Sequence, residues 1–306
     1  MSASSIHPDP SMIGRIPKAR FAFAPDPQHL FAARAARFEA LSEDSRLRPY
    51  LRFLAGISRI QAALAANLPP LPPLPADAIE RARENAMPPI DRPGIAGSAD
   101  CRETLARFLE QAEALEKPAA AAAALAELRA ADAQTLGLAL RNVLAETLPV
   151  DSLAHHLYVA AAVQVHAARL AATLDAERLV PVHVGVCPAC GGRPVASVVT
   201  GVHGLEGARY AVCACCAAQW NEVRVKCLAC GSTKGIGYRA VETGDEEASV
   251  KAEACNNCHH WMKILYQNRN PSLDAVADDV ASLGLDLLMQ DTDYRRAGFH
   301  PFSAGY

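Results

Sequence analysis

The sequence predicts a multi-domain α plus small β protein. In it, an all-helical N-terminal domain precedes two tandem rubredoxin-like or zinc-ribbon-like metal-binding units and a C-terminal helix. Apolar residues recur at helical spacing from about residue 26 to residue 177. After Leu179 the composition changes, and Val, Gly, Pro and Cys replace Ala, Leu and Arg. Nine of the ten cysteines lie between residues 187 and 258, which indicates a metal-binding module.

These changes divide the chain into four predicted parts. They are an all-helical domain at residues 1–180, a first four-cysteine ribbon at 181–223, a second at 224–269, and a C-terminal amphipathic helix with a tail, packed on the body, at 270–306. A chain of 306 residues is long enough for about two domains and a full apolar core.

The charges of the chain nearly cancel, since 30 Lys and Arg stand against 33 Asp and Glu. This balance excludes a strongly basic protein that coats nucleic acid and a protein that binds membranes through a polybasic segment. No apolar run reaches the roughly 18 residues that a membrane span needs. Residues 1–27 lack the charged-then-apolar pattern of a secretory signal and are interrupted by prolines. We therefore expect a soluble, cytoplasmic protein with no direct membrane insertion.

The helical part begins at Asp26, a good N-cap that is followed by proline at the first helical position. A second helix carries an apolar stripe between Phe53 and Leu64. It ends before the proline-rich segment 68–75, which cannot continue a helix. We interpret this segment as a stiff spacer between helices rather than as a ligand for an aromatic groove.

Helices resume near Ala99 and again after Pro118. Ser152 can cap a long helix to about Leu174, and this helix is apolar nearly all round, which predicts a place at the centre of a bundle. We interpret three histidines on it as buried, hydrogen-bonded residues rather than metal ligands. They are His155, His156 and His166.

Three strand-like runs follow, separated by segments that contain glycine, as in hairpins that hold metal. They are residues 195–200, 209–212 and 236–241. Near the end of the chain, Ser272 can cap an amphipathic helix with acidic residues towards its positive N-terminus. The predicted apolar face consists of Leu273, Val276, Val280, Leu283 and Leu287, and the acidic residues are Asp274, Asp278 and Asp279.

Eight cysteines form four C-x-x-C pairs, which are Cys187/Cys190, Cys213/Cys216, Cys227/Cys230 and Cys255/Cys258. This spacing lets the two sulfurs of a tight knuckle reach one ion, and two knuckles complete a tetrahedron. The gaps between successive pairs are 22, 10 and 24 residues, and the long gaps fit knuckles at the turns of adjacent hairpins. We therefore predict two four-cysteine sites, which join the first pair with the second and the third with the fourth.

An internal repeat supports this pairing. The segment that begins Cys187-Pro-Ala-Cys-Gly recurs forty residues later as Cys227-Leu-Ala-Cys-Gly. Gly191 and Gly231 suit the left-handed turn that follows a knuckle, where backbone N–H groups can point at thiolates.

Other residues near the pairs need separate interpretations. Cys215 and Cys101 lie outside the pairs, and we interpret both as small buried residues. Trp220 either marks a partner surface together with nearby basic residues or, like Trp261, covers a ribbon core. Those basic residues are Arg224, Lys226 and Lys263.

Three other interpretations of the pairs are weaker. The segment from Cys255 to His259 matches the C-x-x-C-H pattern of c-type haem attachment, but that chemistry needs export. A thioredoxin-like dithiol needs one C-x-x-C at a helix start rather than four in hairpins. A nucleic-acid-binding ribbon needs a basic face, but residues 181–269 carry nine Lys or Arg and seven Asp or Glu. Four thiolates suit zinc and iron alike, so the spacing does not name the metal.

Longer motifs surround the pairs. They are Cys187-Pro-Ala-Cys-Gly, the run from Cys213 through Trp220 and Arg224-Val-Lys to Cys230, Lys251-Ala-Glu before Cys255, Lys263-Ile-Leu-Tyr-Gln, residues 275–283, and Pro301-Phe302. Together they resemble FdhE, the formate dehydrogenase accessory protein family, closely over roughly residues 185–302 and in general character over the helical front half. Cys215 and His259 depart from the family pattern.

This resemblance implies a cytoplasmic maturation factor for respiratory formate dehydrogenase. Such a factor binds the molybdenum or tungsten catalytic subunit before that subunit is exported. The family resemblance favours iron in two four-cysteine sites, with zinc as the alternative, and it suggests a homodimer. No nucleic-acid partner is expected. The metal ligands carried over are Cys187, Cys190, Cys213, Cys216, Cys227, Cys230, Cys255 and Cys258.

The sequence contains no recognised catalytic motif. The sequence has no Gly-rich phosphate loop, no G-x-S-x-G and no H-E-x-x-H, and a four-cysteine site leaves no open position for a substrate. We therefore expect a binding and assembly factor that is not an enzyme. The alternative is a small iron-dependent electron-transfer or thiol-redox protein.

Overall fold

The computed structural model describes residues 19–241 and 247–303. Residues 1–18 lie outside the described residues. They make up most of the segment 1–27, in which we expect no export signal. Among the described residues, no helix is both long enough and apolar enough to cross a membrane.

The helices and strands alternate little along the chain, since most helices precede most strands. The α-helices are α1 (Pro27–Ser42), α2 (Arg48–Asn67), α3 (Ala76–Glu84), α4 (Ala99–Ala112), α5 (Ala119–Ala130), α6 (Ala133–Leu144), α7 (Leu153–Ala171), α8 (Ala277–Ala281) and α9 (Leu283–Gln290), with short 3₁₀ helices at Pro93–Gly97, Val150–Ser152 and Ala176–Arg178. The strands are β1 (Ala22–Phe23), β2 (Pro194–Val199), β3 (Arg209–Cys213), β4 (Gln219–Glu222), β5 (Ile236–Arg239), β6 (Val250–Cys255), β7 (His260–Tyr266) and β8 (Arg295–Arg296).

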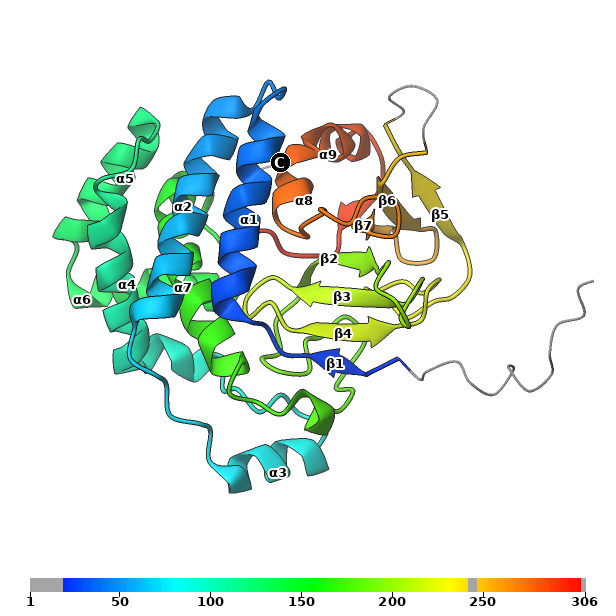
Figure 1. The fold of residues 1–306 in the computed structure, drawn as a ribbon, viewed down its shortest axis with the longest axis horizontal. Helices are drawn as coiled ribbons and strands as arrows, with labels where there is room; N and C mark the ends of the chain where they lie inside the picture. Colours follow the sequence, from blue (N-terminus) through cyan, green and yellow to red (C-terminus); the bar gives the residue numbers. More distant parts are fainter. Residues whose placement is uncertain (1–18, 242–246, 304–306) are drawn as a thin grey trace, which may run out of the picture.

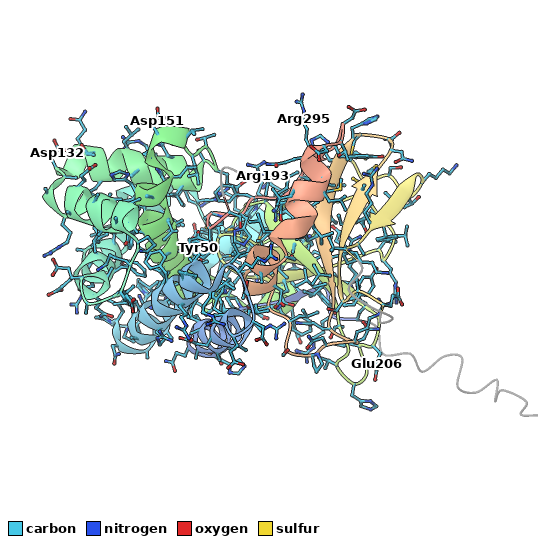
Figure 2. All side chains as sticks on the ribbon, turned by 90° about the horizontal axis from the view of Figure 1, so that it is seen from above. Tyr50, Asp132, Asp151, Arg193, Glu206 and Arg295 are labelled. Carbon is cyan, nitrogen blue, oxygen red and sulfur yellow. The ribbon has the colours of Figure 1, made fainter. Side chains whose placement is uncertain are left out.

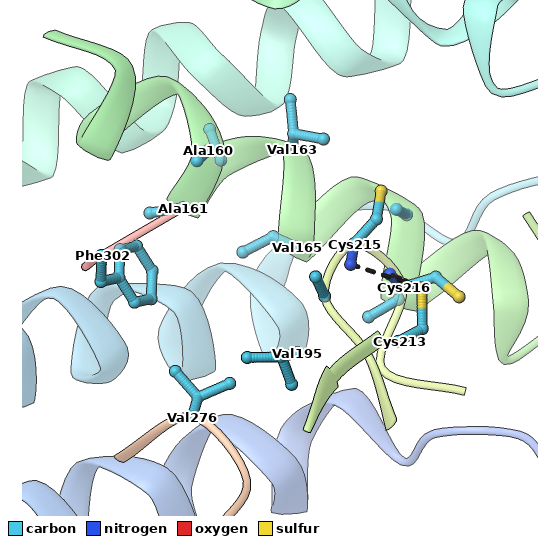
Figure 3. Packing of buried hydrophobic residues seen from close by; sticks show 14 of the residues in the cluster. Ala160, Ala161, Val163, Val165, Val195, Cys213, Cys215, Cys216, Val276 and Phe302 are labelled. Carbon is cyan, nitrogen blue, oxygen red and sulfur yellow. Dashed lines mark hydrogen bonds between the residues drawn. The ribbon is translucent and has the colours of Figure 1, made fainter. Parts of the chain in front are cut away.

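Helices α1, α2 and α4 to α7 form a helical body beside the sheet (Figure 1). Helix α7 contacts α2, α4, α5 and α6, and 14 of its 19 residues are buried. Its side chains pack in several directions, as Val163 and Val165 do (Figure 3). The apolar character of α7 on every face therefore places it at the centre of the bundle, as predicted.

The helix starts follow the sequence in most places. The Asp26 carboxylate accepts the His29 N–H at 3.3 Å, and α5 begins directly after Pro118. Residues 68–75 form neither helix nor strand, as expected of a proline spacer. Helix α7 begins directly after Ser152, as predicted, but the Ser152 hydroxyl lies 3.1 Å from His156 Nδ1 and caps no N–H, and α7 ends at Ala171 rather than near Leu174.

The three histidines of α7 differ in their surroundings. His156 is buried, and its Nε2 lies 3.2 Å from the amide nitrogen of Asn142, as the sequence predicts. His166 is buried too, and its Nδ1 has no hydrogen-bond partner among the described residues. His155 is partly exposed, with its Nε2 2.7 Å from a Glu127 carboxylate oxygen. None of the three lies in a metal-binding cluster of the described residues.

The strands form one eight-stranded sheet rather than two separate ribbons. Its order is β1-β4-β3-β2-β7-β6-β5, and β8 pairs with β7. Neighbours are antiparallel except for the β2–β7 and β7–β8 pairs, and Ser197 of β2 lies opposite Ile264 of β7. The three predicted strand runs are confirmed as β2, β3 and β5, whereas the addition of β1 from the N-terminal segment was not predicted.

A buried arginine crosses the centre of this sheet. Arg209 of β3 donates to a Glu253 carboxylate oxygen of β6 at 2.9 Å, and both side chains are almost fully buried. The same guanidinium donates to Ser197 Oγ at 3.0 Å and to the Lys226 carbonyl at 2.9 Å. The strands β2 to β4 form one hairpin group of the sheet, and β5 to β7 form the other. Arg209 therefore binds both hairpin groups and the segment that links them.

The C-terminal segment forms two short helices instead of the single predicted helix. The Asp274 carboxylate accepts the N–H groups of Val276 and Ala277, so Asp274 rather than Ser272 provides the cap of α8. The buried Lys263 ammonium donates to the carbonyls of Asp279 and Ser282 at 2.7 and 3.2 Å, which takes acceptors away from a continuing helix.

The apolar face predicted for this segment is only partly buried. Leu273, Val276 and Val280 pack into the core, but Leu287 is exposed. The acidic residues Asp278 and Asp279 lie in the first turn of α8, as predicted. The Arg37 guanidinium of α1 binds the Asp278 carboxylate through two hydrogen bonds of 2.6 and 2.9 Å, which attaches α8 to the helical body.

His300 lies buried behind α8 in its neutral form. Its Nδ1 accepts the Phe302 N–H at 3.1 Å, and its Nε2 donates to the Val276 carbonyl at 3.2 Å. Burial is the main cause that lowers the pKa of His300, to about 4. The positive charges of Arg296 and Lys263 also lower this pKa, whereas the negative charge of Asp279 raises it.

Replacement of Arg209 by methionine is expected to lower the free energy of unfolding by about 3–5 kcal/mol, because it leaves the Glu253 charge buried and unpaired. Urea unfolding followed by tryptophan fluorescence measures this, since Trp220 and Trp261 both lie in the sheet. An Arg209→Met/Glu253→Leu double variant should recover much of the loss. Arg107→Met, which breaks an exposed pair with Glu103, should cost less than about 1 kcal/mol. Equal losses in the two single variants would refute this role of Arg209.

Acidification is expected to destabilise the fold in part through His300. Its pKa is about 4 when folded and 6.5 otherwise, so the unfolded chain binds the extra proton between these values. The His300 contribution is therefore complete above pH 6.5, falls as the pH decreases to 4, and amounts to about 3 kcal/mol. His300→Gln should flatten the pH dependence of unfolding by this amount. Parallel curves for wild type and variant would contradict the assignment.

Candidate metal centres

The eight paired cysteines gather into two groups of four. Within each group the sulfur atoms all lie within 4.8 Å of one another. We call them centre 1, made of Cys187, Cys190, Cys213 and Cys216, and centre 2, made of Cys227, Cys230, Cys255 and Cys258. The structure thus joins the first pair with the second and the third with the fourth, as the spacing predicts.

The closest sulfurs across each centre come from different knuckles. In centre 1, Cys190 Sγ lies 3.5 Å from Cys213 Sγ. In centre 2, Cys227 Sγ lies 3.6 Å from Cys258 Sγ. Four sulfurs at such separations match the edges of a tetrahedron around an ion with metal–sulfur bonds of about 2.3 Å.

All four knuckles share one backbone feature. The residue after the second cysteine of each pair has a positive φ, which is +75° at Gly191, +58° at Ala217, +78° at Gly231 and +52° at His259. Glycine adopts this region without strain, so the predicted role of Gly191 and Gly231 is confirmed. At the other two knuckles the turn forms with a side chain present, which is less favourable.

Backbone N–H groups point at the sulfurs of both centres. In centre 1, the N–H groups of Cys215 and Cys216 donate to Cys213 Sγ at 3.4 and 3.5 Å (Figure 3). In centre 2, the Ala229 N–H donates to Cys227 Sγ at 3.3 Å. Such donors stabilise thiolates, which are the form that binds metal.

Centre 1 is buried against the helical body. Its four cysteines are 0–2% exposed. The Ala189 carbonyl in the first knuckle accepts the Ile90 N–H at 3.1 Å. The Ala214 carbonyl in the second knuckle accepts a hydrogen bond from the Gln164 amide of α7 at 2.8 Å. Both knuckles are therefore held by residues from the N-terminal part of the chain.

A carboxylate between two arginines also lies beside centre 1. Glu146 accepts the Arg193 N–H at 2.9 Å and an Arg92 N–H at 2.7 Å. Arg193 lies where the helical body meets the sheet (Figure 2). A methyl group added at Gly192 would lie 3.4 Å from both Glu146 Oε1 and Cys190 Sγ, so the carboxylate and the sulfur both border Gly192.

Arg92 balances the negative charge of centre 1. Burial lowers its pKa, but the neighbouring Cys215, Glu146, Cys190 and Cys213 raise it above the usual value, so the guanidinium remains charged. Neither Arg92 nor Glu146 could be predicted from the sequence as a neighbour of centre 1, because both are far from the cysteines along the chain.

The two unpaired cysteines are buried, as predicted. Cys215 is 8% exposed and lies in the second knuckle of centre 1, outside the group of four. Cys101 is 1% exposed in α4, and burial raises its pKa to about 12. A thiol with so high a pKa is unreactive at neutral pH.

Centre 2 lies at the surface. Cys255 and Cys227 are buried, but Cys258 is partly exposed and Cys230 is exposed. The Asn257 amide donates to Cys230 Sγ at 3.7 Å. A hydrogen bond from the Ser232 N–H lowers the pKa of Cys230 to about 7, although its burial acts the other way. The surroundings of the two centres therefore differ strongly.

Other residues singled out in the sequence have distinct places. Trp220 and Trp261 are buried, so they cover the sheet core rather than mark a partner surface. Lys263 is fully buried and binds Asp279 and Asp286, so it was wrong to consider it for such a surface.

The donor set fits soft metal ions. Each group supplies four thiols in tetrahedral arrangement with N–H donors around them, which suits zinc or iron. The two groups could therefore each hold a metal ion. A bound zinc would be structural, and a bound iron would be able to transfer one electron.

Three family models match successive parts of the chain. "FdhE, N-terminal" matches residues 19–184, "FdhE, central domain" matches 186–224, and "FdhE, C-terminal domain" matches 225–303. The central match spans centre 1, and the C-terminal match spans centre 2.

Individual proteins match over most of their length. The chain is 70% identical to "Protein FdhE homolog" of Rhizobium meliloti (strain 1021) over 306 residues, which is 100% of both chains. It is 34% identical to the homolog of Stutzerimonas stutzeri (strain A1501), with 88% of each covered. The crystal structure of the FdhE protein from Pseudomonas aeruginosa is similar with a TM-score of 0.83 and 30% identity, covering 94% of this chain and 99% of that one.

Metal stoichiometry tests the two groups. Protein loaded anaerobically with Zn²⁺ is expected to hold two ions per chain, and a Cys187→Ser/Cys213→Ser variant is expected to hold one. Cys215→Ala and Cys101→Ala are matched controls that remove a buried thiol outside the groups and should retain both ions. Loss of one ion from the Cys215→Ala variant would make Cys215 a ligand and refute the assignment.

Proposed function

The chain belongs to the FdhE family, and on that premise we propose that it is a maturation factor for formate dehydrogenase. It binds the catalytic subunit in the cytoplasm before that subunit is exported. The observation that carries the proposal is the match to FdhE proteins across the whole chain, both four-cysteine centres included. A homodimer is part of the proposal, and light scattering on the purified protein measures it.

In this function the eight cysteines of centres 1 and 2 bind two metal ions. Iron is favoured by the family resemblance, and zinc is the alternative. Four thiolates close the coordination shell, so neither ion has an open position at which a substrate could bind. The metals then stabilise the sheet, because hairpins this small have little apolar core of their own. The protein therefore acts by binding its client and not as an enzyme.

A second candidate function is supported by one observation. The Cys230 sulfur of centre 2 is exposed, and an exposed iron–thiolate centre can exchange electrons with a partner at its surface. The candidate is a small iron-dependent electron-transfer or thiol-redox protein. It predicts a reversible colour change with reductant and oxidant, whereas a binding factor needs no such change.

An anaerobic pull-down tests the first function. With this protein as bait in a cytoplasmic extract of its host, we expect clear enrichment of the formate dehydrogenase catalytic subunit over bare resin. A Cys187→Ser/Cys213→Ser variant should lose this enrichment, because it cannot complete centre 1. Cys101→Ala, which removes a buried thiol outside both centres, should bind like the wild type. Circular dichroism establishes that each variant is folded. Absence of the subunit from the wild-type eluate would refute the proposed function.

A further inference from the structure

The two centres have the same knuckles but opposite surroundings. Each consists of two C-x-x-C turns with positive-φ residues after them. All four sulfurs of centre 1 are shielded from solvent, whereas centre 2 exposes Cys230 and part of Cys258. A difference in exposure at equal ligand chemistry leads to a difference in how fast a bound ion can leave.

Several independent contacts close centre 1. Ile90 and Gln164 hydrogen-bond to its two knuckles, and Glu146 binds the Arg193 N–H beside them. A surface hollow bordered by Pro88 approaches this centre, but Cys190 there is only 1% exposed. An incoming ligand reaches these sulfurs only after the helical body separates locally from the sheet.

Centre 2 has much lighter cover. Apart from the other cysteines of the centre, the Cys230 sulfur accepts the Ser232 N–H and the Asn257 amide, and Asn257 is itself exposed. The Tyr294 hydroxyl donates to Asn256 Oδ1 at 2.5 Å. The Tyr294 ring stacks on the His259 ring, with 5.6 Å between the ring centroids. These contacts fix the second knuckle but leave the outer sulfur of the first knuckle open to water.

Release of an ion from four thiolates proceeds by replacement of one ligand at a time. The incoming donor atom forms a bond to the metal as one metal–sulfur bond breaks, and the freed cysteine leaves as a thiolate that water can protonate. No change of oxidation state is involved. The step needs access to the metal beside a sulfur that can move, and among the eight sulfurs Cys230 best meets this requirement.

We propose that centre 2 is an exchange site, at which a soft divalent metal ion passes to and from thiol-bearing or chelating partners through the open side at Cys230, while centre 1 retains its ion. The inference rests on the metal binding proposed above for the two centres. It assigns the two centres separate roles. Centre 1 keeps its metal ion and stabilises the contact between the helical body and the sheet, and centre 2 binds and releases its metal ion.

Chelator kinetics test this proposal on the full chain loaded with two equivalents of Zn²⁺. The probe is an excess of the chromophoric chelator 4-(2-pyridylazo)resorcinol, whose absorbance reports free zinc. We expect one equivalent to leave at least tenfold faster than the other. Iodoacetamide added after the fast phase, followed by peptide mass spectrometry, should then label the centre 2 cysteines and spare those of centre 1.

Two variants assign the phases. Asn257→Ala removes the amide from the Cys230 sulfur and should accelerate the fast phase severalfold, with the slow phase unchanged. Glu146→Gln weakens the cover of centre 1 and should accelerate only the slow phase. Unchanged circular dichroism during the fast phase establishes that the release does not require unfolding.

The possible failures are distinguishable. If the wild type holds fewer than two zinc ions at the start, the metal binding in the proposed function fails. If it holds two and both leave at one rate, or if iodoacetamide labels centre 1 before centre 2, the exchange role of centre 2 is refuted.

Discussion

The parallel pairing between β2 and β7 holds the two cysteine-rich hairpin groups together as one sheet. Each group contributes only three strands, and small hairpin assemblies are marginal without further packing. A parallel pair cannot be joined by a tight turn. The strands that lie between β2 and β7 in the sequence therefore pair on the outer sides of these two, with β3 and β4 on the side of β2 and with β5 and β6 on the side of β7. Arg209 reaches across the two central strands to Glu253, so the pairing is reinforced by a buried charge pair. The positions of both metal centres depend on this join.

Buried charges also attach segments that are remote in the sequence. Lys263 and Arg296 surround Asp279 and Asp286 where the C-terminal segment meets the sheet, and Arg37 binds Asp278 where it meets the helical body. A buried charge that loses its partner is strongly destabilising, so these segments dock together or not at all. Phe302 is buried in the apolar core, as Figure 3 shows.

The helical body gives this FdhE-family chain two different centres made from one repeated motif. Where the body covers the repeat, Glu146 and Arg92 lie beside the sulfurs, and the four thiols of centre 1 are shielded from solvent. Where the body ends, Cys230 is exposed. Membership of the family therefore accounts for the presence of both centres, and the contacts of each account for how it can behave.

The sequence alone determined the features that are set within a few residues. The four C-x-x-C knuckles, the turns at Gly191 and Gly231, the Asp26 cap and the all-round apolar α7 follow from local geometry and composition. Only the tertiary structure decided the rest. The single sheet, the break at Ser282, the cover of centre 1 by Glu146 and the exposure of Cys230 all depend on which distant residues meet. Such contacts leave no periodic pattern in the chain, because each is made by a few residues whose partners lie far away along the sequence.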